Sequence, residues 1–335
     1  YELPEVHSII NPNRFDDESD YNQMAAVGVT FLFLMSLRKE LRNHNKFNKK
    51  EPNLLSYLDL VALGTICDVV ELKYYNRLFV MKGLELIHQR RHKGISKLID
   101  NSKLNYSPSS QDIGYIVGPQ INAASRIDDS SLASKLLISN DAEQIETISR
   151  KLFLLNEKRK LIESQILEEA TKQAELQKDK KYILVYAKNW HQGVLGIVAS
   201  KLLDQFNKPI IVLSFLNSLG TGSARSIRGV DLGSLILNAK NQDIIIDGGG
   251  HAMAAGLKLN YNNLDKFKNF LNESFKKYEK HIFEKFITFD LIISVNDINN
   301  NLLESLERLE PFGKGNPEPY FIIYDLKIES IKIIK

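Results

Sequence analysis

The segment Ile244-Ile-Ile-Asp-Gly-Gly-Gly-His-Ala-Met-Ala-Ala-Gly256 joins a short β-branched run to three glycines and a histidine. The isoleucines predict the end of a buried strand. The glycines predict a loop, because glycine reaches positive φ and has no Cβ to keep a ligand from the main chain. Two interpretations of His251 are open: a structural histidine in a tight turn, and a pocket where backbone N–H groups and an imidazole bind a phosphate.

Alternating strand and helix patterns surround this segment and predict an α/β domain over about residues 180–280. We expect strands at 182–187, 209–214, 220–227 and 244–246, a loop running into a helix over 190–203, and helices at 232–239 and 263–278. Residues 321–334 alternate like strands and predict a small β domain.

The expected strand 220–227 carries a hydroxyl and a guanidinium two residues apart. Because side chains alternate along a strand, Ser223 and Arg225 project to the same face. A hydroxyl beside a guanidinium is suited to hold a phosphate. If this strand lies near the glycines, then Ser223, Arg225 and His251 converge on one anion; the alternative is three unconnected surface features.

Before residue 180 the pattern is helical. Apolar residues at helical spacing predict helices at 24–41, 54–72, 74–89 and 141–178, with a short strand at 6–10. Segment 54–72 is apolar on nearly every face and is expected to be buried, with Asp68 among apolar neighbours. A buried carboxylate must be paired or bound to a metal; a metal ligand, a helix-end carboxylate and an ion pair with Lys73 or Arg77 remain open.

A second run of small residues, Gly118–Ile127, carries Asn122 and Arg126. Their spacing of four places both side chains on one helical face. A guanidinium among small residues can present its fork to a phosphate. The alternative is an ion pair between Arg126 and Asp128 or Asp129.

Composition bounds the possible functions. The 335 residues predict about two domains, and a formal net charge of +3 means that any polyanion site must be a local group of cations. The single cysteine excludes internal disulfides and fits a cytoplasmic protein, and no apolar run is long enough for a membrane helix. The first residue is tyrosine, which suggests a fragment of a longer protein.

Six segments resemble successive motifs of the RecJ family, bacterial single-strand-specific 5′→3′ DNA exonucleases among the DHH phosphoesterases. They are Leu63–Val69, Gly118–Ile127, Trp190–Ser200, Gly222–Ser226, Gly249–Gly256 and Glu310–Pro319. The resemblance implies an α/β protein in four parts: the C-terminal, mostly helical part of a DHH catalytic domain (1–140), a long connector helix (141–180), a DHHA1 substrate-binding domain (181–282), and the start of a β-rich, OB-like nucleic-acid-binding domain (283–335).

The resemblance also implies roles for particular residues. Asp68 matches the last aspartate of a cluster that binds two Mn²⁺ or Mg²⁺ ions, and is thereby a metal ligand and catalytic residue. Asn122 and Arg126 match the lining of the substrate cleft, although Ser125 stands where glycine is expected. The residues that match those holding the DNA 5′ end and scissile region are Ser223, Arg225, Gly249, Gly250 and the catalytic His251.

In that family the Asp-x-Asp and Asp-His-His motifs precede the Glu-Leu-Pro that stands here at residues 2–4. We therefore expect this chain alone to be inactive or nearly so, because hard cations need about six oxygen ligands each. The implied partners are single-stranded DNA with a free 5′ end, a single-strand-binding protein and a helicase, and the protein is expected to be a monomer. Two alternatives remain: a metal-independent strand-binding module, and a DHH-family hydrolase of oligoribonucleotides or phosphoadenosine phosphate.

Overall fold

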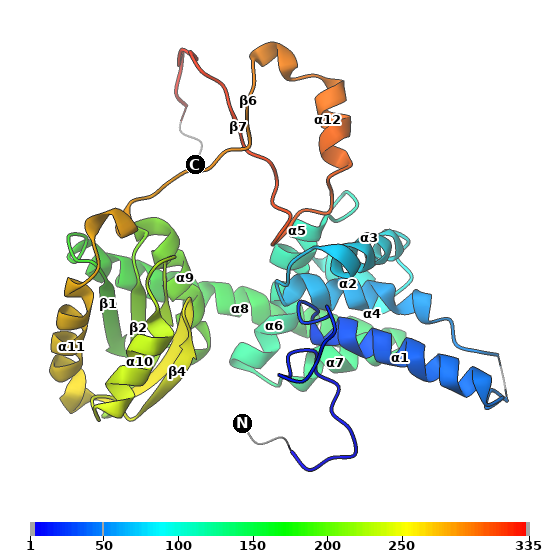
Figure 1. Cartoon of the computed structure of the whole chain (residues 1–335), viewed down its shortest axis with the longest axis horizontal. Coiled ribbons are helices and arrows are strands. Elements are labelled where there is room, and N and C mark those ends of the chain that lie inside the picture. Colours follow the sequence, from blue (N-terminus) through cyan, green and yellow to red (C-terminus); the bar gives the residue numbers. More distant parts are fainter. Residues whose placement is uncertain (1–3, 49, 333–335) are drawn as a thin grey trace. The chain divides into compact units, whose positions relative to one another are not determined.

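The computed structural model describes residues 4–48 and 50–332 (Figure 1). Its contacts divide into two compact units. The unit that we call the helical unit comprises Tyr1–Asn122, Ser131–Phe153 and Thr288–Lys335. The other, the sheet unit, comprises Ala123–Ser130 and Leu154–Ile287. The fold is mixed α/β, with a mostly helical part followed by an α/β part.

A five-stranded sheet in the order β1-β2-β3-β5-β4 forms the centre of the sheet unit. Strands β1 and β2 are parallel, and every other neighbouring pair is antiparallel. The parallel pair is joined through helix α9 (Leu195–Phe206), as a crossover connection requires. The strands are β1 (Ile183–Lys188), β2 (Ile210–Leu216), β3 (Leu219–Arg225), β4 (Asp247–His251) and β5 (Ala254–Asn260).

Apolar side chains fill both faces of this sheet. On one face, Leu213, Leu257 and Phe267 belong to a core that includes helices α10 (Leu232–Asn241) and α11 (Leu264–Lys276). On the other face, Val185 and Val198 belong to a core that includes α9 and the end of helix α8 (Ala142–Glu175). Residues of β1 and β2 alternate between these two cores, which gives a helix–sheet–helix sandwich.

The position of the fourth strand corrects the sequence prediction. Residues 244–246 form a bend, and the glycines expected in a loop form β4 itself, followed by a two-residue turn into β5. The reason is tertiary: glycines lack the β-branched side chains that mark a strand in sequence, and here they permit close packing. A Cβ on Gly248 would lie 2.6 Å from Ile236 Cγ2, and one on Gly250 would lie 2.3 Å from the Ala254 carbonyl oxygen.

Short helices make up most of the helical unit, and the long α8 contributes to both units. Helix α2 (Leu58–Cys67) is its buried centre, and helix α3 (Tyr74–His88) packs closely on it. Gly83 permits this approach, because a Cβ on that residue would lie 2.2 Å from the Leu58 carbonyl oxygen. The remaining bounds are α1 (Ala26–Asn43), η1 (Leu54–Tyr57), α4 (Lys93–Asn101), α5 (Ser110–Asp112), the π-helical η2 (Ile113–Val117), α6 (Gly118–Ile127) and α7 (Ser131–Ile138).

Two predictions for the helical unit were wrong. The expected helix 54–72 stops at Cys67, since α2 ends there and Asp68 is its exposed C-cap residue. The expected strand 6–10 is irregular backbone, because no neighbouring strand in the described residues pairs with it. The buried carboxylate of α2 is Asp59 instead, whose Oδ1 accepts a hydrogen bond from the Leu60 N–H at 2.7 Å.

The C-terminal segment has less regular structure than its sequence predicts. Strands β6 (Leu291–Ile292) and β7 (Phe321–Ile322) pair in parallel, and α12 spans Asn300–Glu307. The turn that follows α12 packs on the helical unit: the Leu72 N–H donates to the Lys314 carbonyl at 2.7 Å, and Ser110 Oγ donates to the Phe312 carbonyl at 2.6 Å. Among the described residues, no helix is long and apolar enough to cross a membrane.

Candidate phosphate-binding site

Strand register brings the predicted residues of the sheet unit to one face. Arg225 of β3 lies opposite Ala254 of β5, which lies opposite His251 of β4. Directly paired residues project to the same side of a sheet, so Arg225 and His251 face the same way, two strands and roughly 10 Å apart. The prediction that Ser223 shares this face is confirmed, because Arg225 Nη1 donates to Ser223 Oγ at 3.2 Å.

Beside the row Arg225–Ala254–His251, the next row on the same face consists of Ser223 and a floor of two glycines. Gly249 lies opposite Gly256, which lies opposite Ser223. A Cβ on Gly249 would meet no heavy atom within 4 Å, and one on Gly256 would meet only the Gly222 carbonyl oxygen, at 3.9 Å. These two glycines therefore have open space above them, unlike Gly248 and Gly250.

The start of helix α9 lies against the same face of the sheet. A Cβ on Gly196 would lie 3.0 Å from Arg225 Nη2 and 3.2 Å from Ser223 Oγ. The N-cap residue, Val194, has no side chain that caps the helix, and the Leu195 N–H donates to the Gln192 carbonyl in the preceding turn. The positive end of the helix dipole still favours an anion at this place. Sequence reasoning missed this contribution, although the paired glycines at 193 and 196 were a signal for close backbone approach.

A second guanidinium, Arg126 of α6, belongs to the same site. Arg126 Nη1 donates to the Gly193 carbonyl at 3.0 Å, and a Cβ on Gly193 would lie 2.2 Å from the Arg126 carbonyl oxygen. Burial lowers the pKa of Arg225, and the charge of Arg126 lowers it further. Two half-buried guanidiniums that repel each other favour an anion between them.

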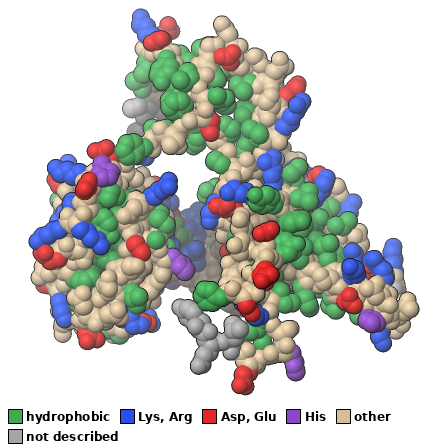
Figure 2. Space-filling model, viewed as in Figure 1, with side chains coloured by type: hydrophobic (Ala, Val, Ile, Leu, Met, Phe, Trp, Pro, Cys, Tyr) green, Lys and Arg blue, Asp and Glu red, His purple; other side chains and the backbone are tan. Residues whose placement is uncertain are grey.

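Helix α8 adds buried charges beside Arg126. The Glu163 carboxylate accepts from Arg159 Nη1 at 2.5 Å and from Lys201 Nζ at 2.6 Å, and both Arg159 and Glu163 are buried. Burial lowers the pKa of Arg126, the Arg159 charge lowers it further, and Glu163 opposes them. Cations therefore outnumber carboxylates in this group. On the face drawn in Figure 2, by contrast, basic and acidic side chains are interspersed.

Asn122 and Ser125 lie with Arg126 on α6, and both are exposed. Asn122 stands one helical turn before Arg126, as its spacing of four residues predicts.

Asp68 belongs to the helical unit, whereas Arg126, Ser223, Arg225 and His251 belong to the sheet unit. It is exposed, and the next residue, Val69, has φ +55°, a conformation that a β-branched residue rarely adopts. Burial, reinforced by the Asp68 charge, raises the pKa of Cys67 to about 11, which keeps that thiol protonated. Within residues 4–48 and 50–332, no three His, Cys, Asp or Glu side chains form a group able to hold a metal ion. One carboxylate does not fit a two-ion centre.

Comparison with known proteins assigns two segments of the chain. Residues 179–277 match the DHHA1 domain and residues 289–335 match the RecJ OB domain. The chain is 35% identical to the single-stranded-DNA-specific exonuclease RecJ of Haemophilus influenzae over 95% of its own length, and 33% identical to that of Bacillus subtilis over 99%. The chain is homologous to the RecJ exonucleases.

Solved RecJ structures have the same fold. The chain superposes on Thermus thermophilus RecJ in complex with Mg²⁺ with a TM-score of 0.76 and 28% identity, covering 88% of this chain and 44% of that one. The Mn²⁺ complex of the same RecJ gives the same TM-score and identity over 42% of its chain. The chain spans 58% of the length of the H. influenzae RecJ and 41% of the B. subtilis RecJ. The DHHA1 match contains Ser223, Arg225 and the Gly249–His251 segment.

Proposed function

We propose that this chain is the substrate-holding part of a single-stranded-DNA-specific 5′→3′ exonuclease of DNA repair and recombination. The observation that carries the proposal is the convergence of Ser223, Arg225, Arg126 and the first turn of α9 on one side of a glycine-floored surface, with His251 on the other. A 5′-phosphate would bind among the guanidiniums at the positive end of α9. The strand would then cross Gly249 and Gly256 toward His251.

Each residue has a distinct role in this proposal. Arg225 supplies a guanidinium fork, Ser223 a hydroxyl donor, and Arg126 a second cation fixed by the Gly193 carbonyl. His251, exposed at the sheet edge, contacts the phosphate at the scissile bond. The edge strand β4 contributes main-chain N–H groups that no further strand pairs. Asn122 contacts the strand from α6.

The proposed chemistry is divalent-metal hydrolysis of a phosphodiester, with Mn²⁺ or Mg²⁺ as the ions. Both ions occur in solved RecJ structures. We propose Asp68 as one ligand and expect the others from a part of the full protein outside the 335 residues. The chain alone should then bind DNA and cleave it slowly or not at all.

Two measurements test this proposal. Fluorescence anisotropy with a single-stranded oligonucleotide should give tighter binding for a 5′-phosphate than for a 5′-hydroxyl, and Arg225→Lys should remove most of that preference, because lysine lacks the bidentate fork. Equal affinity for the two ends in the unaltered chain would refute the 5′-phosphate site. Rapid degradation of the same strand by this chain with Mn²⁺ would refute the inactivity of the chain alone.

A second candidate is a strand-binding module that works without metal. The absence of a metal-ligand group among the described residues favours it for this chain taken alone. Its affinity should fall steeply with salt, since binding to phosphates releases counterions. A single-strand-binding protein and a helicase as partners, a monomeric state and a cytoplasmic location remain predictions.

A further inference from the structure

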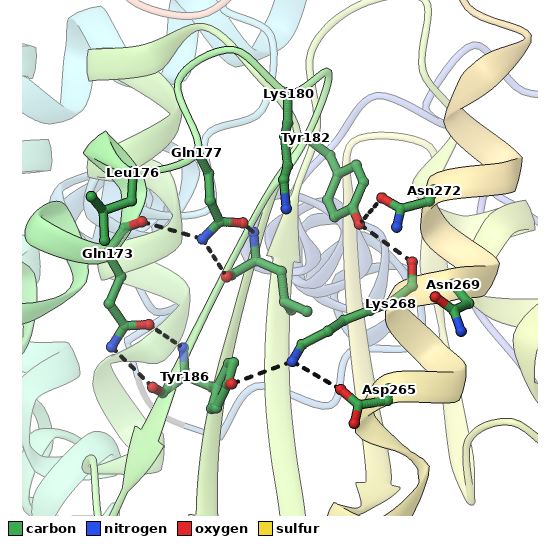
Figure 3. A pocket seen from close by; sticks show the side chains of 11 residues that line it. Gln173, Leu176, Gln177, Lys180, Tyr182, Tyr186, Asp265, Lys268, Asn269 and Asn272 are labelled. Atoms are coloured by element: carbon green, nitrogen blue, oxygen red, sulfur yellow. Dashed lines mark hydrogen bonds and ion pairs between the residues drawn. The ribbon is translucent and has the colours of Figure 1, made fainter.

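A pocket lies at the edge of the sheet opposite to β4, between the C-terminal end of α8, strand β1 and helix α11 (Figure 3). Its volume is about 680 Å³, within the usual range for small-molecule sites. Amines, phenols and amides make up most of its polar lining. They are Lys180 and Lys268, Tyr182 and Tyr186, and Gln173, Gln177, Asn269 and Asn272.

The two glutamines explain why no strand adds to this edge. Gln173 donates to the Tyr186 carbonyl and accepts from the Tyr186 N–H, both at 3.0 Å. Gln177 bonds Leu184 in the same way, at 2.9 and 3.3 Å. These amides take the place of a neighbouring strand. A peptide that pairs with β1 is therefore excluded as the occupant unless both glutamines move.

Lys268 provides a held cation inside the pocket. Its Nζ lies 3.1 Å from Asp265 Oδ1, 3.3 Å from the Tyr186 hydroxyl and 5.1 Å from the Tyr186 ring centre. Asp265 is the one carboxylate of the lining and is already paired with this lysine, so the pocket has no ligand set for a metal ion. Lys180 adds a second cation from the loop that follows α8 (Figure 3).

Beside Lys268, the pocket also offers groups that suit a planar ligand. The Tyr182 hydroxyl donates to Asn272 Oδ1 at 2.8 Å, which leaves the Asn272 amide N–H groups to face the pocket. Leu176, which is 88% exposed, adds an apolar side chain to the lining, and Tyr186 adds an aromatic ring. Aromatic rings stack on bases, and asparagine amides can form hydrogen bonds with a base edge.

We propose that this pocket binds a nucleotide, with its phosphate at Lys268 and Lys180 and its base between Leu176 and Tyr186, facing the amides of Asn269 and Asn272. Free phosphate would fill only a small part of the volume, and an apolar ligand would leave the Asn272 amide N–H groups without a hydrogen-bond partner. The cleavage proposed above would release nucleoside monophosphates, but the binding itself does not rest on that reaction.

Calorimetric titration with dAMP tests the proposal. Because dAMP can also enter the phosphate site, the titration uses the whole chain both unaltered and with Arg225→Met. In the Arg225→Met protein, dAMP should still bind, and adding Lys268→Met should weaken it by about 10-fold or more. Asn272→Asp is the conservative second variant: it keeps the acceptor for Tyr182 but replaces the amide N–H groups that face the base with a carboxylate, and it should weaken dAMP binding.

The outcomes separate the two sites. Deoxyadenosine and inorganic phosphate should each bind the Arg225→Met protein at least about 10-fold more weakly than dAMP, because each lacks half of the recognised groups. Unchanged dAMP affinity in both Lys268→Met and Asn272→Asp, or equal affinity for phosphate alone, overturns the nucleotide pocket. Loss of all dAMP binding on Arg225→Met overturns it too, while leaving the 5′-phosphate site intact.

Discussion

Strand β4 offers two neighbouring glycines at which the same added methyl group should have opposite consequences. A Cβ on Gly249 would meet no heavy atom within 4 Å. A Cβ on Gly250, where φ is +155°, would lie 2.3 Å from the Ala254 carbonyl oxygen and 2.6 Å from Ala255 Cα. The pair therefore separates an effect on the fold from an effect on the ligand.

For stability, Gly249→Ala should change the free energy of unfolding by less than about 1 kcal/mol, because the methyl has room and the unfolded chain loses some freedom. Gly250→Ala should lower it by about 3 kcal/mol, since backbone atoms must move and the φ value disfavours alanine. Urea denaturation followed by circular dichroism measures both. A Gly250→Ala protein as stable as the unaltered chain would refute the β4–β5 register.

For binding, Gly249→Ala adds a methyl group to the glycine floor beside the Arg225–Ala254–His251 row. If the strand crosses this floor, a methyl group there should weaken a 5′-phosphorylated single strand by roughly 10-fold, or about 1.4 kcal/mol. Fluorescence anisotropy at one fixed salt concentration gives the ratio. Unaltered affinity in a folded Gly249→Ala protein would mean that the DNA does not pass over Gly249, and the proposed path would be wrong.

Three further predictions concern residues that position the site or the core. Gly193→Ala should reduce 5′-phosphate preference in the anisotropy assay, because its Cβ would lie 2.2 Å from the Arg126 carbonyl oxygen; unchanged preference would contradict this packing. Glu163→Gln should lower the free energy of unfolding by about 3–5 kcal/mol, because it leaves Arg159 buried without its partner. Replacing both Arg159 and Glu163 with methionine should lower it much less. Equal urea midpoints for the two variants would argue against this ion pair. Burial raises the pKa of Asp59, so the ionised carboxylate destabilises the folded protein. This loss of folding stability grows as the pH rises. Asp59→Asn should therefore raise the melting temperature at pH 7 and raise it less at pH 4, and a gain independent of pH would contradict the stated cause.

Local sequence pattern predicted most elements of the sheet unit. Apolar runs at 182–187 and 209–214 fall within two residues of β1 and β2, because each strand is buried on both faces and so reads as a continuous apolar run. The period-two alternation also placed Ser223 and Arg225 on one face, which the hydrogen bond between them confirms.

Pattern failed where a residue's environment comes from distant parts of the chain. Asp68 was expected among buried apolar neighbours, but α2 ends one residue before it and leaves it exposed. Glycines 248–250 were expected in a loop, because strand propensity is a property of side chains that glycine lacks. Their pairing with β5 and the packing of Gly248 against Ile236 are contacts between separate elements.

The sequence by itself determined the α/β class, the helical first part, and the residue types of a phosphate site, since these follow from local periodicity and side-chain chemistry. Only the tertiary structure decided that β5 separates Arg225 from His251, that the start of α9 and Arg126 complete the site, and that Gly249 has open space where Gly250 has none. Strand order and backbone approach depend on which elements pack together, and that information does not reside in any one segment of the chain.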